Sequence, residues 1–310
     1  MLIPYKSPDA YSEIDFQNNL KQSVIKTLSY SMVFNYPLTL SEIYRYLIGK
    51  SLVNLPLLRD SLDRLVETKA LKLTLGYYYL PGFEGSVAQR ERRKVVAGLK
   101  FPVLERFVSL ARYIPTIKMI GLSGGLAMEN AHKEDDIDLF VVTSAGTTWL
   151  TRLLCVFLAE SLRIRRRPSD SGKQVENKIC LNMFVDEAHM EIPKEERDLF
   201  CAHEVIQLKP LYDKECVYEK FLLENSWVSK YLPNAVSSLN IKVAPFASSS
   251  ERPSMVRFAE RVAYIIQRAY MKMHVTHEVL KDGYLRFHPS DARRFVLRRY
   301  EQILQRAIIL

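Results

Sequence analysis

The sequence contains few of the residues that define small cross-linked or fibrous proteins. Its 310 residues include only 4 Cys and 11 Gly, and 48% of them are hydrophobic. This composition excludes a collagen-like chain, a disulfide-stabilised miniprotein and a disordered chain. The cysteines are spaced too widely for a CxxC zinc or redox pair, and each has apolar neighbours. We therefore interpret them as reduced core residues. They are Cys155, Cys180, Cys201 and Cys216.

Long apolar runs and targeting signals are also lacking. The longest apolar stretch, residues 149–162, contains Arg152 and Glu160 and is too short to span a bilayer. The first residues do not show the charged start and apolar run of a signal peptide. No internal repeat or low-complexity tract is present. We therefore expect a cytoplasmic protein without a membrane partner.

The net charge of +9 is distributed unevenly along the chain. Residues 121–247 carry 15 basic and 19 acidic groups, whereas residues 82–120 carry 8 and 3 and residues 248–310 carry 12 and 6. An acidic middle between basic flanks would suit a cation site beside surfaces that attract phosphate. Solvated helix faces would produce the same distribution.

The first 82 residues predict three helices and a small hairpin. An apolar residue recurs every four positions across residues 20–28, as on one face of a helix. Thr39 and Glu42 have the spacing of a capping box, and Asn54 is a second N-cap candidate. Alternating leucines before Gly76 and tyrosines after it indicate two short strands.

Three helices followed by a two-stranded ribbon resemble a winged-helix domain, with the second and third helices as its helix-turn-helix. The resemblance implies possible DNA contact. A protein-docking role stays open, because acidic groups alternate with the basic ones on the third helix and would weaken the attraction for phosphate. These groups are Arg59, Arg64, Lys69, Asp60, Asp63 and Glu67.

The strongest chemical signal is a glycine turn followed by a pair of aspartates. A predicted buried strand over residues 117–122 runs directly into Ser123, Gly124 and Gly125 and then a helical pattern. Glycines at such a turn let the backbone approach a bound phosphate closely. Asp136 and Asp138 lie two residues apart at the front of an apolar strand, so strand alternation directs both carboxylates to one face. Carboxylates in this arrangement suit one or two Mg²⁺ ions.

This order of strand, Ser-Gly-Gly turn, helix and Asp-x-Asp strand resembles the nucleotidyltransferase superfamily typified by DNA polymerase beta. The resemblance covers about residues 115–190. It implies an α/β fold with a mixed sheet, in which Asp136 and Asp138 hold Mg²⁺ or Mn²⁺ and the turn holds phosphate. It also implies transfer of a nucleoside monophosphate from a nucleoside triphosphate to an acceptor. The acceptor is open: a small molecule, a protein or a nucleic acid.

One position departs from this family's pattern. The family usually supplies a third carboxylate from a later strand, and here the matching strand, residues 178–186, has Asn182 at its centre. Asparagine can ligate a metal or orient a nucleotide, but it cannot accept a proton at neutral pH. Asp186 shares its face but lies at the far end of the strand. Either two aspartates suffice and substrate or water takes the proton, or the domain binds nucleotide without fast turnover.

Two cations are candidate phosphate ligands. Arg152 lies on a predicted helix that starts near Thr147, and Lys178 lies at the start of the third strand. Both are equally compatible with solvated surface charges. The arginine run of residues 163–167 follows that helix, where the helix dipole alone favours cations.

The chain is predicted to have four parts. Residues 1–82 form the winged-helix-like domain, and residues 83–114 form a helical connector broken near Pro102. Residues 115–245 form the nucleotidyltransferase core, which is helical from residue 193 onward. Residues 246–310 form a helical region with two long helices. The alternative to an enzyme is a DNA-binding or protein-docking regulator that senses nucleotide through a catalytically silent core.

Overall fold

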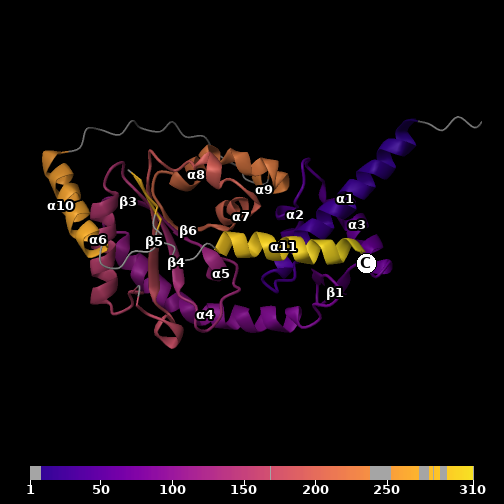
Figure 1. The fold of residues 1–310 in the computed structure, drawn as a ribbon, viewed down its shortest axis with the longest axis horizontal. Coiled ribbons are helices and arrows are strands. Elements are labelled where there is room, and N and C mark those ends of the chain that lie inside the picture. The colour runs from indigo at the N-terminus through magenta and orange to yellow at the C-terminus, as the bar shows by residue number, and fades with distance from the viewer. Residues whose placement is uncertain are drawn as a thin grey trace, which may run out of the picture.

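The computed structural model describes residues 8–167, 169–237, 253–271, 279–281, 283–286 and 292–309. Over these residues the chain is an α/β protein with a six-stranded mixed sheet and a separate two-stranded hairpin (Figure 1). The predicted α/β class and mixed sheet are therefore confirmed. Within the described residues, every helix is too short or too polar to cross a bilayer.

The N-terminal part has the three helices and the hairpin that the sequence predicts. The predicted capping box is formed: the Thr39 hydroxyl accepts a hydrogen bond from the Glu42 N–H, and the Glu42 carboxylate accepts one from the Thr39 N–H at 2.8 Å. The Asn54 side chain caps the third helix by accepting from the Leu57 N–H. The elements are α1 (Pro8–Met32), α2 (Leu40–Arg45), α3 (Leu55–Glu67), β1 (Lys72–Thr74) and β2 (Tyr77–Tyr79).

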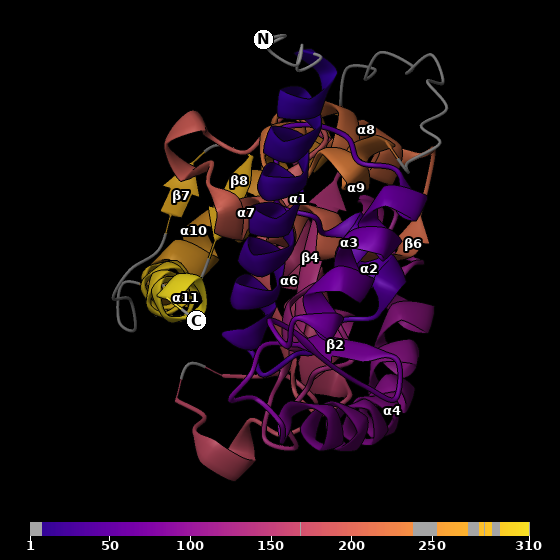
Figure 2. The ribbon, with the colours of Figure 1, turned by 90° about the vertical axis from the view of Figure 1, so that its right-hand side faces the viewer.

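The C-terminal helix α11 (Ala292–Ile309) packs on this N-terminal part. It crosses the C-terminal half of α1, and Figure 2 shows it end-on beside that helix. Ile303 of α11 is buried in the same apolar cluster as Leu28 of α1 and Leu62 of α3. The N-terminal helices and α11 thus share one apolar core, and no local sequence pattern predicts this contact.

Helix α4 (Ser86–Ala111) connects the N-terminal part to the sheet, and the predicted break at Pro102 is wrong because the helix continues through it. A proline inside a helix removes one hydrogen bond and costs about 3 kcal/mol. Beyond the proline, Leu104 and Phe107 are fully buried against the sheet. Burial of two such side chains contributes a comparable amount, about 1.5–3 kcal/mol each, and so offsets that cost.

The six-stranded sheet has the order β6-β3-β4-β5-β8-β7, in which only β4 and β5 are parallel. The predicted strands β3, β4 and β5 form its centre, whereas the outer strands lie in segments that the sequence predicts as helical. These outer strands are three to five residues long, which is too short for a clear alternation of apolar residues. The strands are β3 (Ile117–Leu122), β4 (Ile137–Thr143), β5 (Ile179–Asp186), β6 (Lys209–Asp213), β7 (Val279–Lys281) and β8 (Tyr284–Arg286).

Helices cover both faces of the sheet (Figure 1). Leu139 and Val141 of β4 point to the face covered by α4, α6 and α10, and Phe140 and Val142 point to the face covered by α7, α8 and α9. By the same alternation, the Asp138 side chain points to the face covered by α7. The remaining helices are α5 (Gly124–Ala127), α6 (Thr148–Ser161), α7 (Leu199–Gln207), α8 (Val217–Glu224), α9 (Pro233–Ser237) and α10 (Ser254–Met271), with short 3₁₀ turns at Gly172–Gln174, Lys194–Glu196 and Ser226–Lys230.

Candidate functional site

The glycine turn lies directly against Asp138. The Ser123 N–H donates a hydrogen bond to the Asp138 carbonyl at 3.0 Å, and the Ser123 hydroxyl donates to the same oxygen at 3.3 Å. Gly124 has φ +66°, and a Cβ at this position would lie 2.9 Å from Asp138 Oδ2. Any other residue would therefore strain the backbone and press on the carboxylate. Gly125 continues into α5, and its carbonyl accepts from the Asn130 N–H at 2.8 Å.

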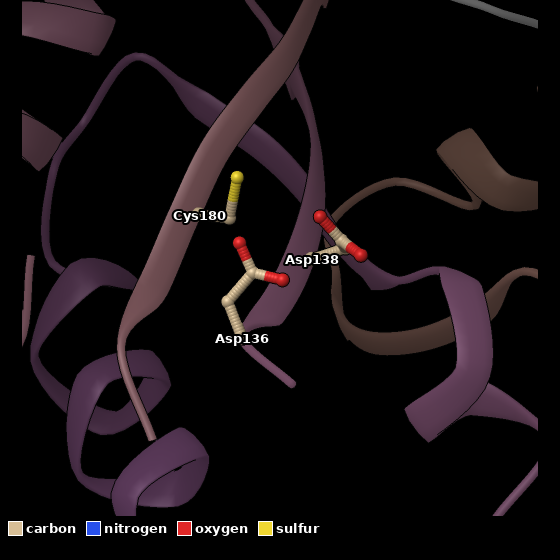
Figure 3. Close-up of side chains that lie close together, drawn as sticks. All are labelled: Asp136, Asp138 and Cys180. Carbon is tan, nitrogen blue, oxygen red and sulfur yellow. The ribbon is translucent and has the colours of Figure 1, made fainter. Parts of the chain in front are cut away.

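Asp136, Asp138 and Cys180 form a compact cluster where β4 meets β5. Asp138 is in parallel register with Cys180, and Asp136 immediately precedes β4. One ligand atom from each of the three side chains lies within 4.8 Å of the others. Figure 3 shows the Asp136 carboxylate directed toward the other two side chains. The predicted convergence of the two aspartates is present, and the cysteine is an addition to it.

The electrostatics of the cluster follow from its burial. Burial raises the pKa of Asp138 from 3.8 to about 7, and the negative charge of Asp136 adds to the shift. Burial, followed by the charge of Asp138, raises the pKa of the Cys180 thiol well above its ordinary value. The thiol is therefore protonated at neutral pH, and its single S–H can donate to either of the two carboxylates. It is a neutral donor in this state, not a thiolate ligand.

Arg166 is the cation that reaches this cluster. Its backbone N–H donates to the Ile179 carbonyl at 3.0 Å, which fixes the segment beside the start of β5. Its Nε then lies 2.8 Å from Asp136 Oδ2 as an ion pair. The neighbouring Arg165 and Arg167 pair with Glu160 at 3.0 and 2.9 Å instead. Arg166 is thus the arginine of this run that contacts an aspartate, and the sequence patterns did not single it out.

The donor set fits a hard divalent cation at its two carboxylates. Carboxylate oxygens are the protein ligands that Mg²⁺ prefers, and Asp136 and Asp138 present theirs to one another across a short gap. A protonated thiol is a poor ligand for Mg²⁺, so Cys180 would support the carboxylates by hydrogen bonds. Arg166 engages one oxygen of Asp136, and an ion would share that carboxylate with it.

Arg152 and Lys178 do not lie at this cluster. Arg152 projects from α6, on the opposite face of the sheet from Asp138, and its Nη1 donates to Gln267 of α10 at 2.6 Å. Lys178 precedes β5 beside the aspartates, but its Nζ donates to the Arg163 carbonyl at 2.9 Å. Both cations therefore satisfy polar groups at helix α6 and its C-terminal end. Their role as phosphate ligands stays a prediction that these contacts do not support.

Asn182 and Asp186 lie further along β5. The pairing of β4 with β5 shifts by one residue between the pairs at Asp138 and Phe140, and Asn182 falls within this shift. The side chain of Asn182 is outside the part of the chain that the structure describes. Asp186 is buried at the other end of the strand and bonds to His189 and to the Gly146 and Ala188 N–H groups. It is therefore not a substitute for the third carboxylate.

Two functional candidates that the sequence analysis missed lie on α7. His203 and Glu204 line the same cavity as Asp138 and the glycine turn. Burial raises the pKa of Glu204 to about 7 and lowers the pKa of His203 to about 3. A signal was present in the sequence, because two adjacent ionisable residues interrupt an otherwise apolar helix of residues 199–206.

Comparison with known proteins identifies no relative. No protein family, curated protein or solved structure is detectably similar to this chain.

Proposed function

We propose that this protein is a Mg²⁺- or Mn²⁺-dependent nucleotidyltransferase with a polymerase-beta-type core. It would transfer a nucleoside monophosphate from a nucleoside triphosphate to an acceptor and release pyrophosphate. The observation that supports this most is the packing of Gly124 against the Asp138 carboxylate, with Asp136 in the same cluster. A phosphate approaching the bare backbone of this turn would come directly beside both carboxylates.

Each residue of the cluster has a defined role in this proposal. Asp136 and Asp138 would hold the divalent cation, which when bound supplies the positive charge that neutralises phosphate oxygens. Ser123 ties the turn to β4 through the Asp138 carbonyl and so sets the distance between turn and carboxylate. Cys180 orients the carboxylates by hydrogen bonding, and Arg166 balances the charge of Asp136.

The proposed reaction is a single displacement at phosphorus. An acceptor oxygen forms a bond to the α-phosphorus, the bond from that phosphorus to the bridging oxygen breaks, and pyrophosphate leaves with the electron pair. The acceptor's proton passes to water, since the proposal assigns no protein base. Positioning and charge neutralisation supply most of the catalysis in such transfers.

Pyrophosphate release tests the proposal. Wild-type protein is incubated with each of the four nucleoside triphosphates and Mg²⁺ or Mn²⁺, beside Asp136→Asn and Asp138→Asn variants. Release should fall on the order of 100-fold or more in both variants, because several kcal/mol of charge stabilisation is lost. Glu134→Gln is the matched control, since Glu134 is an exposed acid two residues before Asp136. Equal release by all four proteins would contradict the proposal.

The Arg166 ion pair favours a second candidate function. An arginine already paired with Asp136 lowers the negative charge available to a cation. In this alternative the core binds nucleotide without turnover and regulates binding to DNA or to a protein. Tight nucleotide binding in calorimetry without pyrophosphate release from any of the four nucleotides is its expected signature.

Arg166→Gln separates the two candidates. If the arginine holds the site silent, its removal should raise the affinity for Mn²⁺, because Asp136 loses its counter-ion. If it assists nucleotide binding, removal should weaken nucleotide affinity by about tenfold, as expected for loss of a charge-assisted hydrogen bond. Arg167→Gln removes the same charge one residue away, from the Glu160 pair, and should change neither affinity.

The N-terminal part is proposed as a winged-helix-like domain, supported by the sequence of α2, α3 and the β1–β2 hairpin. The exposed side of α3 carries Arg59 and Arg64 together with Asp60, Asp63 and Glu67. Because the acids outnumber the bases on this surface, we expect weak binding to random-sequence duplex DNA. Fluorescence anisotropy over a series of salt concentrations measures it, and a steep salt dependence would reverse this expectation.

A further inference from the structure

A cavity of about 340 Å³ opens beside the glycine turn. Its walls come from three separate parts of the chain: α1 and the segments on either side of α2, the sheet with α7, and the start of α11. Figure 1 shows α11 bridging the sheet and the N-terminal helices. This volume lies in the range of small-molecule sites. Ser123, Gly124 and Asp138 form one end of it.

Six aromatic rings lie in the walls of this cavity. They come from α1 and the turn that follows it, from the C-cap of α2, from α7 and from β8, and they present both apolar surface and π faces. Rings of this kind suit a flat apolar body, and they also stabilise a nearby cation. They are Tyr30, Phe34, Tyr36, Tyr46, Phe200 and Tyr284.

The two arginines of the cavity already have acidic partners. Arg286 pairs with Glu196 at 2.5 Å, and Arg293 pairs with Asp198. The positive charges of the wall are therefore neutralised locally. This arrangement disfavours a polyanion, because a nucleic acid would require a wall with excess positive charge.

His203 leaves an unmet hydrogen bond in this wall. Its ring stacks on Tyr30 with centroids 3.9 Å apart, and its side chain is almost fully buried. Its Nδ1 lies 3.4 Å from Gln207 Nε2, so a neutral ring that accepts there carries its proton on Nε2. That Nε2 is buried and has no hydrogen-bond partner among the described residues. A buried donor of this kind calls for an acceptor atom.

Glu204 leaves a second unmet interaction. No described residue gives its carboxylate a hydrogen bond or an ion pair, and the nearest positive influence on it is Arg286, which Glu196 already engages. Its side chain is half-buried in the cavity wall, where a carboxylate without a counter-ion favours a cationic partner. A ligand that brings an ammonium group to Glu204 would satisfy it.

We propose that this cavity binds a small aromatic amine bearing a hydroxyl, and that molecules of this class are the acceptor of the nucleotidyl group. The ring lies among the aromatic walls, an oxygen accepts from His203 Nε2, and the ammonium pairs with Glu204. Because the cavity reaches Gly124 and Asp138, a hydroxyl on such a ligand comes beside the phosphate turn. The acceptor assignment rests on the proposed function, whereas the binding assignment does not.

Calorimetry on the full chain without nucleotide or metal tests the binding step. The probe is tyramine, with phenethylamine lacking the hydroxyl and 4-hydroxyphenylacetate lacking the ammonium as matched ligands. Tyramine should bind about tenfold more tightly than phenethylamine, which lacks one hydrogen bond, and more tightly still than 4-hydroxyphenylacetate, whose carboxylate replaces the ion pair with Glu204 by a repulsion. Absence of tyramine binding, or equal affinity for all three ligands, would overturn the proposal.

Variants locate the binding in the cavity. Ala292 lines the cavity from an exposed position at the start of α11, so Ala292→Trp should block entry and abolish tyramine binding. Ile308→Trp places the same side chain at an exposed position of the same helix, outside the cavity, and should leave affinity unchanged. Unchanged binding in the Ala292 variant would place tyramine elsewhere and contradict the assignment.

Two further variants separate the polar contacts. His203→Phe keeps an aromatic ring against Tyr30 but removes the donor, so tyramine should bind no better than phenethylamine. Glu204→Gln should remove the preference for tyramine over 4-hydroxyphenylacetate. Thermal unfolding of each variant verifies its fold, and if one fails to fold, the ligand comparison with the wild type still decides the contact.

A labelling experiment separates failure of this proposal from failure of the proposed function. Cell extract is incubated with the protein and α-³²P nucleoside triphosphates and then fractionated by size. We expect the label to appear in small molecules and expect added tyramine to suppress that labelling. Label in protein or nucleic acid would overturn the acceptor assignment. No label above the Asp136→Asn blank contradicts the transferase function alone. Because Asp136 does not line the cavity, that variant should still bind tyramine.

Discussion

Asp138 and Asp186 lie near opposite ends of the paired strands β4 and β5. Asp186 is buried and bonds to the Gly146 N–H at 2.7 Å, the Ala188 N–H at 3.0 Å and His189 Nδ1 at 2.6 Å. Asp138 faces a second carboxylate and a protonated thiol, and its pKa is raised to about 7. On one sheet, Asp186 is thus stabilised by protein hydrogen-bond donors, whereas Asp138 lies beside a second acid.

The difference shows what each end does for the molecule. At the Asp186 end, the Asp186 N–H also donates to the Gly283 carbonyl at 2.8 Å, which joins the β7–β8 hairpin to the sheet. Gly283 has φ +71°, and a Cβ there would collide with His189 and Asp186. That end is therefore built for stability. At the Asp138 end, repulsion between carboxylates is retained, as is common at sites that bind a cation.

The largest expected effect is on catalysis, where substitutions of Asp138 and of Asp186 should have different consequences. Asp138→Asn should lower pyrophosphate release on the order of 100-fold or more, because the proposed ion loses a charged ligand. Asp186→Asn should leave the release rate per folded molecule near that of wild type, since Asp186 lies outside the cluster. Steady-state assays on the two variants, with folded fractions from circular dichroism, measure both. Equal losses would refute the assignment.

Stability should show the reverse order. Asp186→Ala should lower the free energy of unfolding by about 2–4 kcal/mol, because buried N–H donors lose their acceptor. Asp138→Asn should leave it unchanged or raise it, since the variant removes a carboxylate that burial and Asp136 both disfavour. Urea denaturation measures the two values. A larger loss in the Asp138 variant would mean that this end is also structural.

Gly124→Ala tests the contact between the turn and Asp138. The positive φ alone should cost about 1–2 kcal/mol, and the added Cβ would displace the Asp138 carboxylate and weaken metal-nucleotide binding. Gly98→Ala is the control, because Gly98 lies in α4 with open space around it. The free energy of unfolding of this variant should rise by about 0.5–1 kcal/mol. Denaturation and calorimetry give the two readouts. Unaltered nucleotide affinity in Gly124→Ala would remove the turn from the site.

The smallest expected effect is in the wild-type pH profile, because the contributions of three buried or half-buried groups partly oppose one another. Asp138 has a folded pKa raised from 3.8 to about 7, so the native state binds more protons and the contribution to stability falls as pH rises across this window. His203 has a pKa lowered from 6.5 to about 3, so its contribution rises with pH from about 3 to 6.5. Glu204, raised from 4.5 to about 7, adds to the fall.

Substitution at Asp138 sharpens this comparison. In Asp138→Asn the falling contribution is reduced, so unfolding free energy should rise more with pH between about 4 and 6.5 than in wild type. Urea denaturation at several pH values measures the slopes. A steeper fall with pH in the variant would show that the pKa of Asp138 is not raised in the folded protein.

The central strands and the caps follow from local patterns. Ile117–Leu122 is predicted residue for residue, since apolar residues bounded by a proline turn and a Ser-Gly-Gly turn leave little choice of structure. Thr39 and Asn54 cap helices because the capping interaction needs only atoms three residues apart. By contrast, the outer strands β6, β7 and β8 exist only because a partner strand offers hydrogen bonds, and their own residues do not specify them.

The candidate site was predicted in part for the same reason. The alternation of β4 is enough to place Asp136 and Asp138 together, because both lie within one short segment. Arg152 and Lys178 were assigned from charge and sequence proximity, and neither property reveals which face of a sheet a helix covers. Cys180 and Arg166 reach the cluster through the parallel pairing of β5 and the bridge beside it.

By itself, the sequence determined the α/β class, the order of its central elements, and a glycine turn followed by two carboxylates, because each of these depends on residues close together in the chain. Only the tertiary structure decided that Arg166 pairs with Asp136, that α11 packs on α1, and that His203 and Glu204 share a cavity with Gly124. These contacts join segments far apart in the sequence. They are selected by burial of shared apolar surface, which a local pattern does not encode.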